Sequence, residues 1–165
     1  MNVELRQLTA SDYPGLKDSM ISSYPNWENS HWKEHHISSL LTRFPEGQLC
    51  VTVDGKFAAC ALSIIVEYNN FGHQHTYREI TGNHKFSTHS YNGDVLYGID
   101  VFVHPDYRGM RLGRRLYDAR KELCETLNLK AIVFGGRIPD YHKYRDELTP
   151  RQYIDKVRQK ELHDP

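Results

Sequence analysis

The stretch of the sequence with the clearest chemical potential is Arg108-Gly-Met-Arg-Leu-Gly113. Two glycines on a short turn let backbone amides approach a ligand closely, and the start of a following helix favours negative charge. Arg114 and Arg115 continue the basic run, and arginine pairs bidentately with phosphate oxygens. These residue types at this spacing predict a cradle for a phosphate-bearing ligand.

Two predicted elements position this turn. Residues 95–103 form a nearly continuous β-branched and aromatic run that ends before Pro105, which is typical of a buried strand. After the turn, apolar residues recur at helical spacing, at Leu112, Leu116, Ala119, Leu123 and Leu127. Taken alone, the pattern also fits a purely structural corner between a strand and a helix with a solvated basic face.

The whole string Val103-His-Pro-Asp-Tyr-Arg-Gly-Met-Arg-Leu-Gly113 resembles the acyl-CoA-binding motif of the GCN5-related N-acetyltransferase (GNAT) family. In that family a strand is followed by Arg-Gly-x-Gly-x-Gly or Ala and then by a helix, and Arg111 stands here where the middle glycine is usual. The resemblance covers most of the chain. It implies the GNAT fold, an α/β (α+β) domain with a mixed, mostly antiparallel sheet, helices on both faces and a central parallel strand pair splayed to hold acyl-CoA.

The resemblance also implies acetyl-CoA as the co-substrate, with no metal. The backbone of Phe102 and Val103 is expected to pair with the pantetheine like an added strand. The pyrophosphate is expected on the cradle, whose residues are Arg108, Gly109, Met110, Arg111, Leu112, Gly113 and Arg114.

Direct acetyl transfer to an amine needs a base for the ammonium and an acid for the leaving thiolate. Asp100 is the candidate base, because family members often carry an acidic residue near this place on the strand; a carboxylate that only pairs with a neighbouring arginine remains the alternative. The family commonly uses a tyrosine after the next strand as the acid, and both Tyr141 and Tyr144 lie in that region. Tyr144 is preferred.

Upstream of the motif, the sequence predicts a strand over 3–8 and a helix from the Thr9–Asp12 capping box to about Tyr24. Ser30 is expected to cap a second helix that ends before Phe44-Pro45. In acetyltransferases these helices border the acceptor pocket. Here they supply four aromatic and imidazole side chains, which are expected to pack or face solvent rather than contact substrate: Trp27, Trp32, His35 and His36.

Asp54-Gly55 between two apolar runs predicts a β-hairpin. Residues 67–93 then show little periodicity, and a segment of this length in a compact domain is usually functional or mobile. It carries four histidines, His73, His75, His84 and His89. They raise the alternative of a metal protein, which the missing Cys or Glu at a diagnostic spacing disfavours; pocket lining or a plain polar loop is expected.

Downstream of the motif, residues 129–134 predict a strand parallel to the first, residues 141–145 a short helix, and Thr149-Pro-Arg-Gln152 the capped start of a last helix. The final pair of strands usual in the GNAT family is missing. An unpaired sheet edge after residues 129–134 is therefore expected, and such an edge favours association or an attached domain.

The composition bounds the class of protein. The chain has 165 residues, with 21 Lys and Arg against 21 Asp and Glu, which predicts a single domain over 1–165 and a cytoplasmic protein that binds neither nucleic acid nor membrane. Cys50, Cys60 and Cys124 lie among apolar residues and are expected to be buried thiols.

A narrower similarity concerns the kind of longer protein in which such a domain is found. The segments 98–113, 135–141 and 161–165 look similar to the acetyltransferase domain that precedes a nitrilase-like carbon-nitrogen hydrolase in some two-domain proteins. This implies that the chain is part of a longer protein, with a fused hydrolase domain or a second copy as its partner. Two functions stay open: acetylation of a small-molecule or peptide amine, or a CoA-binding sensory or docking domain that serves the hydrolase.

Overall fold

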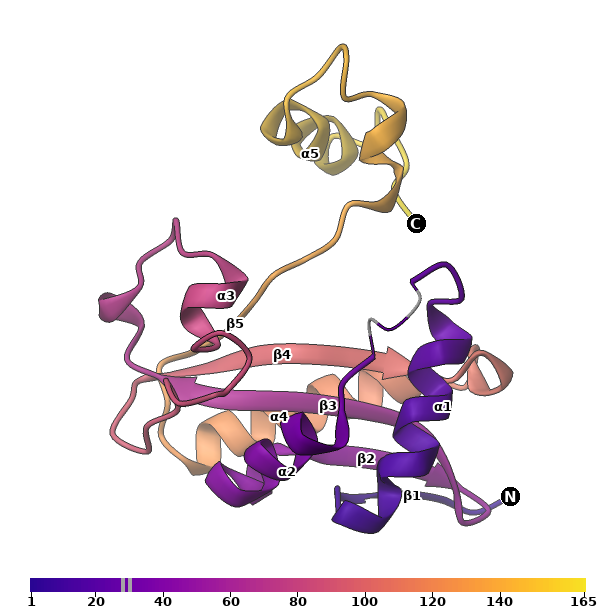
Figure 1. Cartoon of the computed structure of the whole chain (residues 1–165). Helices are drawn as coiled ribbons and strands as arrows, with labels where there is room; N and C mark the ends of the chain where they lie inside the picture. The colour runs from indigo at the N-terminus through magenta and orange to yellow at the C-terminus, as the bar shows by residue number, and fades with distance from the viewer. Residues whose placement is uncertain (28, 30) are drawn as a thin grey trace. The chain divides into compact units, whose positions relative to one another are not determined.

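The computed structural model describes residues 1–27, 29 and 31–165 (Figure 1). By its internal contacts the chain divides into two compact units, Met1–Phe134 and Gly135–Pro165, where the sequence predicts one domain over 1–165. In the part of the chain that is described, no helix has the length and apolar character needed to cross a membrane.

The larger unit is built on a five-stranded sheet with the strand order β1-β2-β3-β4-β5. Its strands are β1 (Val3–Gln7), β2 (Leu49–Val53), β3 (Lys56–Val66), β4 (Val95–Val103) and β5 (Ala131–Phe134). β1 to β4 pair in sequence as antiparallel neighbours, and β5 runs parallel to β4. The mixed, mostly antiparallel sheet predicted from the sequence is confirmed, as is the hairpin at Asp54-Gly55, where both residues have positive φ.

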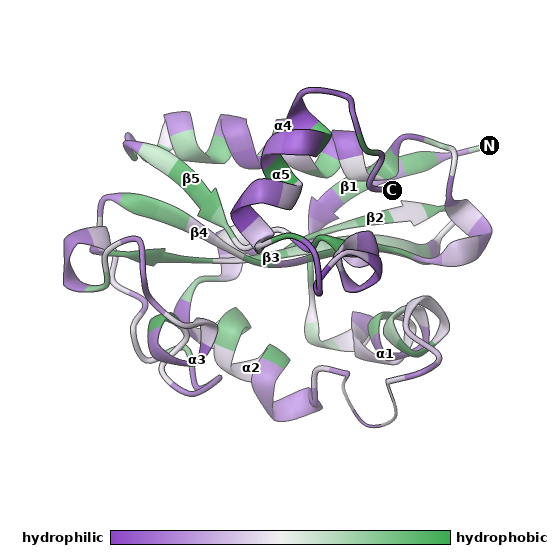
Figure 2. Ribbon diagram, turned by 90° about the horizontal axis from the view of Figure 1, so that it is seen from above, coloured by the Kyte–Doolittle hydropathy of each residue, from purple (hydrophilic) through white to green (hydrophobic). Residues whose placement is uncertain are grey.

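Helices cover both faces of this sheet (Figure 2). On one face, α1 (Tyr13–Ser23) contacts β3 and β4, and α2 (Glu34–Arg43) contacts β3. On the other face, α4 (Leu112–Thr126) packs across β2, β3, β4 and β5. Alternation along the strands sends side chains to each layer in turn, so the sheet has a core on both sides.

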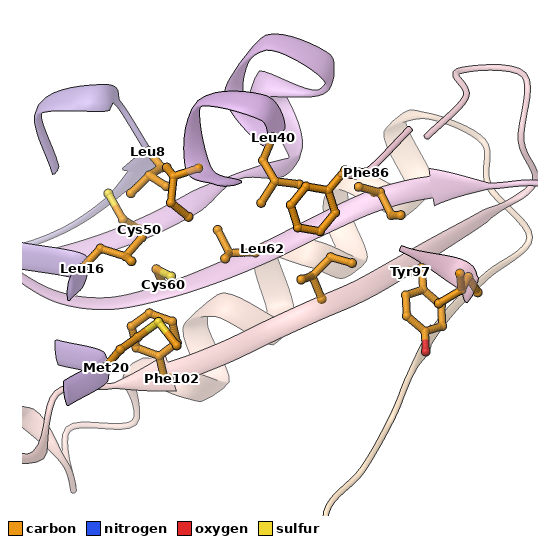
Figure 3. Packing of buried hydrophobic residues seen from close by; sticks show 14 of the residues in the cluster. Leu8, Leu16, Met20, Leu40, Cys50, Cys60, Leu62, Phe86, Tyr97 and Phe102 are labelled. Carbon is orange, nitrogen blue, oxygen red and sulfur yellow. The ribbon is translucent and has the colours of Figure 1, made fainter. Parts of the chain in front are cut away.

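The main core lies between the sheet and the α1–α2 layer (Figure 3). There Leu16 and Met20 of α1 and Leu40 of α2 meet Cys60 and Leu62 of β3. A second cluster on the opposite face joins Leu112 and Leu116 of α4 to β2 and β3. The three cysteines are free and buried, as predicted: Cys50, Cys60 and Cys124.

The second helix begins later than expected. Lys33 is its N-cap, with an extended backbone, and its amide donates a hydrogen bond to His36 Nδ1 at 3.0 Å. The His36 ring thus bonds back to the N-cap amide, as the Glu or Gln of a capping box does. The proposed cap, Ser30, lies outside the described residues.

Residues 67–93 are folded rather than irregular. The segment contains a 3₁₀ turn at Tyr68–Asn70 and the short helix α3 (Tyr77–Ile80), capped by Thr76. Ile80 and Phe86 are fully buried and anchor it to the main core. Tyr68 and Phe71 also pack against this core. Because these apolar residues are spaced irregularly among polar ones, the sequence shows no periodicity there.

The smaller unit, Gly135–Pro165, consists of a 3₁₀ turn at Pro139–Lys143 and the helix α5 (Pro150–Arg158). The predicted capping box is present, since the Gln152 amide donates to Thr149 Oγ1 at 3.2 Å and the Thr149 amide donates to Gln152 Oε1 at 2.9 Å. Tyr153 is buried and donates to Asp164 Oδ1 at 2.7 Å. The short helix expected at 141–145 is this 3₁₀ turn.

β5 is the outer strand of the sheet. It pairs with β4 alone, and within the described residues no strand follows it. The unpaired edge expected from the sequence is therefore present at β5.

Candidate active site

The glycine-bearing turn connects the end of β4 to the start of α4. Gly109 has φ +85, a left-handed conformation that glycine adopts freely. Arg111, the N-cap of α4, is also left-handed, with φ 59 and ψ 27. The first backbone hydrogen bond at this end of the helix joins the Arg115 amide to the Arg111 carbonyl at 3.2 Å. The amides of Leu112, Gly113 and Arg114 are therefore without helical acceptors and are available to an anion.

Four cations surround these amides, and all of them are exposed: Arg108, Arg111, Arg114 and Arg115. Among the ion pairs of the described residues, none involves these side chains. Gly113 sits on the first helical turn, where a Cβ would meet only Val103 Cγ2, at 3.9 Å. The turn thus combines amides that lack helical acceptors with exposed cations, and its role as a phosphate cradle stays a prediction.

β4 extends beyond its parallel partner. The β4–β5 pairing runs from Val95↔Ala131 to Gly98↔Phe134, whereas β4 continues to Val103. Residues 99–103 therefore have a sheet neighbour, β3, on one side only. We call this unpaired side of residues 99–103 the opening, or open edge, of β4; the splay of the two parallel strands stays a prediction.

Hydrogen-bond alternation identifies which backbone groups face the opening. The register pairs Ala59 with Val103, and the next residue of the chain, His104, donates from its amide to the Ala58 carbonyl at 2.8 Å. Bonded and non-bonded pairs alternate along an antiparallel ladder, so Phe102 directs its amide and carbonyl towards β3. Val101 and Val103 direct theirs towards the open edge, where Ser23 Oγ donates to the Val103 carbonyl at 3.2 Å. The geometry thus adds Val101 to the backbone groups expected to pair with a ligand and turns Phe102 away.

A β-bulge interrupts β4 at the start of this opening. The register passes from Leu62↔Asp100 to Ser63↔Gly98, which leaves Ile99 without a partner. The Tyr77 hydroxyl donates to the Ile99 carbonyl at 3.0 Å. A bulge of this kind re-aims the side chains that follow it, here Asp100.

Arg120 of α4 fixes the bulge from the opposite face. Its Nη2 donates to the Leu62 carbonyl at 2.6 Å and to the Asp100 carbonyl at 3.0 Å, and the side chain is 1% exposed. Burial lowers the pKa of Arg120 from its ordinary value, which lies far above neutral, so the group stays charged. Gly98 makes room for it, because a Cβ there would lie 2.9 Å from Arg120 Nη1.

The Asp100 side chain faces the α1–α2 layer. Trp32, which precedes α2, donates from Nε1 to Asp100 Oδ2 at 3.1 Å. Asp100 and Val103 are separated by about 10 Å along an extended strand. A carboxylate and a phosphate cradle therefore lie at the two ends of the open edge of β4.

The candidate acids lie in the smaller unit. The Tyr141 hydroxyl donates to the Leu148 carbonyl at 2.8 Å, and its ring packs on Tyr153. The Tyr144 ring also contacts Tyr153, at a centroid distance of 5.5 Å, but its hydroxyl makes no hydrogen bond to any described residue. The Tyr141 proton is thus engaged in a hydrogen bond and the Tyr144 proton is not, among the described residues, and the role of Tyr144 as the acid stays a prediction.

The four histidines of residues 67–93 are dispersed. His75 lies against the Tyr97 hydroxyl at 3.0 Å, His73 against the Tyr68 hydroxyl at 3.2 Å, and His84 packs on Trp32. His89 stacks on Phe44 in the core. Among residues 1–27, 29 and 31–165, no three His, Cys, Asp or Glu side chains form a group that could hold a metal ion.

Three contributors to this site carry no sequence signal that singles them out. Trp32 is expected from the sequence to pack, and it does pack, but it also reaches Asp100 across 68 positions. Tyr77 lies in a segment without periodicity. Arg120 occupies a charged position on an amphipathic helix, where solvent exposure is the ordinary expectation; only a glycine opposite it, at Gly98, hints otherwise.

Residues 3–143 match the family described as Acetyltransferase (GNAT) family. Two curated proteins of Bacillus subtilis (strain 168) are similar to this chain: the probable hydrolase YhcX, 39% identical over 161 residues, and the uncharacterized N-acetyltransferase YkwB, 33% identical over 134 residues. The matches cover 98% and 81% of this chain but 31% and 59% of those proteins. The chain thus spans less than two thirds of the length of either relative.

Among solved structures, the GphF GNAT-like decarboxylase in complex with isobutyryl-CoA is similar in fold. The TM-score is 0.68 at 18% sequence identity, and the match covers 98% of this chain and 80% of that one. At this identity the likeness concerns the fold alone.

Proposed function

Because this chain belongs to the GNAT acetyltransferase family, we propose that it is an N-acetyltransferase that moves an acetyl group from acetyl-CoA to an amine. The family uses acyl-CoA, and the chain has its fold, with the parallel β4–β5 pair beside the motif helix. The observation that carries the proposal is the open edge of β4, with the phosphate cradle at one end and the Asp100 carboxylate at the other.

In this proposal, acetyl-CoA takes the place of the strand that β4 lacks. The pantetheine amides bond the backbone of Val101 and Val103, in the manner of an added strand. The pyrophosphate lies on the amides that begin α4, and Arg108 and Arg114 neutralise it. These contacts would hold the thioester close to the bulge at Ile99, next to Asp100.

The chemistry is a direct transfer. Asp100 takes a proton from the acceptor ammonium, and the free amine attacks the thioester carbonyl carbon. A carbon–nitrogen bond forms and the carbon–sulfur bond breaks. The CoA thiolate receives a proton, which we assign to the Tyr144 hydroxyl. The attacking nitrogen gives up its second proton, which restores the Tyr144 hydroxyl, and Asp100 releases the first to water, so the products are an N-acetylated amine, free CoA and one proton.

Turnover with acetyl-CoA and a panel of small and peptide amines tests this function, with acetylated products identified by mass spectrometry. With an amine that reacts, Asp100→Asn is expected to lower kcat by about 10²–10⁴-fold, the usual worth of a positioned base. Tyr144→Phe should lower kcat to a similar degree. The two variants should alter opposite limbs of the pH–rate profile, the acidic limb for the base and the alkaline limb for the acid.

Affinity for CoA is the control, since neither group contacts the phosphates in this proposal. If both variants keep near-normal turnover with their CoA affinity intact, the assignment of base and acid is wrong.

A second function is favoured by one observation, that the match to YhcX, a probable hydrolase, leaves more than two thirds of that protein outside this chain. On this alternative the chain binds CoA and docks on or reports to a carbon-nitrogen hydrolase, through the β5 edge, with little catalysis of its own. Tight CoA binding without acetylation of any amine in the panel would select it. The β5 edge could instead pair with the same edge of a second copy. Light scattering tests this, because a dimer has twice the mass of the single chain.

A further inference from the structure

The contact between Trp32 and Asp100 joins two parts of the larger unit that are remote in sequence. Trp32 lies just before α2, and Asp100 lies on β4 directly after the bulge. The indole Nε1 donates to Oδ2 of the carboxylate at 3.1 Å, while the main chain of Asp100 is held by Arg120. Both the backbone and the side chain of the candidate base are therefore fixed.

Trp32 is itself held in place. Its carbonyl accepts a hydrogen bond from the Tyr13 hydroxyl at 3.0 Å, and its amide donates to Met20 Sδ at 3.4 Å. Three rings surround the indole at centroid distances of 5.4–5.9 Å, those of His36, His84 and Phe86. A side chain locked by its neighbours can impose a direction on the group it bonds.

We propose that Trp32 is a positioning residue for Asp100, which orients the carboxylate towards the acceptor amine and stabilises its ionised form. The hydrogen bond from the indole holds one carboxylate oxygen, Oδ2, at a fixed position. A donor to a carboxylate favours the charged state, so the base is ready at neutral pH. This inference rests on the proposed function, because it assigns a partner to the same base.

Other titratable or charged groups close to Asp100 and Trp32 also influence the proposed titration. Arg120 reaches the Asp100 carbonyl from α4, and the Cys60 thiol of β3 lies close enough to interact electrostatically with the carboxylate. The rings of His36 and His84 contact the Trp32 indole. Protonation of these histidines can therefore also shift the Trp32 indole signal. A variant of Asp100 is needed to separate that shift from the one caused by protonation of Asp100.

The experiment is a pH titration of the ¹⁵N-labelled full chain by NMR, read at the indole N–H. The chain has two tryptophans, Trp27 and Trp32, so Trp32→Phe and Trp27→Phe assign both signals. Trp27, which is half exposed and stacks on Tyr24, supplies the reference signal. In a parallel sample, ¹³C-labelled aspartate reports the Asp100 carboxyl directly, identified by its loss in Asp100→Asn.

The Trp32 indole proton is expected to move upfield as the Asp100 carboxylate protonates, with the midpoint seen in the ¹³C titration, and Asp100→Asn should abolish that step. Trp32→Phe keeps an aromatic ring and removes the donor, so the Asp100 midpoint should rise. With an amine that turns over, the acidic limb of the pH–rate profile should move to higher pH by the same shift.

An Asp100 midpoint that is equal in the wild type and in a folded Trp32→Phe variant would overturn the inference. So would a Trp32 signal that keeps its acidic step in Asp100→Asn. Acetyl-CoA binding, measured separately by calorimetry on the same samples, distinguishes this failure from failure of the proposed function: a protein that binds no acetyl-CoA fails the latter whatever its Trp32 signal does.

Discussion

The left-handed conformation of Arg111 explains a feature that the sequence presents as a departure. The family usually has glycine at this position, and φ 59 with ψ 27 lies in the region that glycine occupies without strain. A left-handed residue with a Cβ costs roughly 1–2 kcal/mol. The chain accepts this strain at the start of α4 and gains a fourth cation beside the cradle.

Arg111→Gly should therefore stabilise the free protein. Relief of strain outweighs the 0.5–1 kcal/mol, roughly, that glycine costs through the unfolded chain, so a net gain of about 0.5 kcal/mol is expected in urea denaturation. Arg114→Gly is the matched control, because this arginine lies inside the helix and should lose about 1 kcal/mol. Equal losses in both variants would show that Arg111 is not strained.

At the scale of residues, the sequence predicts features that depend on neighbouring positions in the chain. The cradle follows from glycines and arginines at close spacing, and the buried cysteines follow from their apolar neighbours. The bond between Trp32 and Asp100 could not be predicted, since nothing local links a tryptophan before one helix to a carboxylate on a distant strand. The same holds for the backbone direction of Phe102, which depends on the register with β3.

Among the elements, the bulge in β4 depends on space made by a glycine. A Cβ at Gly98 would lie 2.9 Å from Arg120 Nη1 and 3.0 Å from Phe134 Cβ. Arg120 cannot withdraw easily, because its donors serve the Leu62 and Asp100 carbonyls in a buried setting.

Gly98→Ala is expected to destabilise the protein by about 1–3 kcal/mol, the usual cost of overpacking a core. Gly136→Ala serves as its control, since a Cβ there meets nothing within 4 Å. Thermal unfolding measures both. A Gly98→Ala protein as stable as the control would mean that Arg120 is not confined by this strand.

The elements that could be predicted from the sequence are those with a strong local pattern. The strands, the Asp-Gly hairpin, the motif helix and the Thr149 capping box all follow from periodicity or turn chemistry. Residues 67–93 resist prediction because their order comes from two buried anchors, Ile80 and Phe86, and not from a repeating pattern. The bulge is likewise invisible, since a continuous apolar run does not reveal an extra residue.

For the molecule as a whole, buried histidines link stability to pH. His89 accepts a hydrogen bond from the Ile65 amide at 3.0 Å, and its Nε2 is buried with no partner among the described residues. Burial lowers the pKa of His89 below its ordinary value of 6.5, and the nearby Glu46 carboxylate opposes this. Burial also lowers the pKa of His36, so more than one histidine acts in this direction.

A lowered folded-state pKa means that the unfolded chain binds the proton first. The free energy of unfolding should therefore be at its full value above pH 6.5 and fall as pH decreases from there towards the folded pKa. His89→Asn, which can keep an acceptor for Ile65, should reduce this slope by at most about 1.4 kcal/mol per pH unit. Urea denaturation across pH measures it, with exposed His163→Asn as control; an unchanged slope in His89→Asn would contradict the account.

The division of the chain into Met1–Phe134 and Gly135–Pro165 was not predicted, because composition bounds the size of a domain but not the contacts within it. The sheet and the cradle belong to the larger unit, and both candidate tyrosines belong to the smaller one. The attached domain expected from the sequence stays a prediction.

The central claim is that acetyl-CoA binds at the open edge of β4 with its pyrophosphate on the start of α4, and Gly113→Val tests it most directly. A Cβ at Gly113 meets only Val103 Cγ2, at 3.9 Å, so the free protein has room at this position and the variant is expected to fold. The branched side chain would crowd the space proposed for the phosphates, whereas Gly113→Ala is the matched control, because the motif admits alanine at this position. Calorimetric titration with acetyl-CoA should therefore show at least a tenfold weaker Kd in Gly113→Val, which is about 1.4 kcal/mol of binding free energy, and little change in Gly113→Ala. A correctly folded Gly113→Val protein that binds acetyl-CoA as tightly as the wild type would show that the site lies elsewhere.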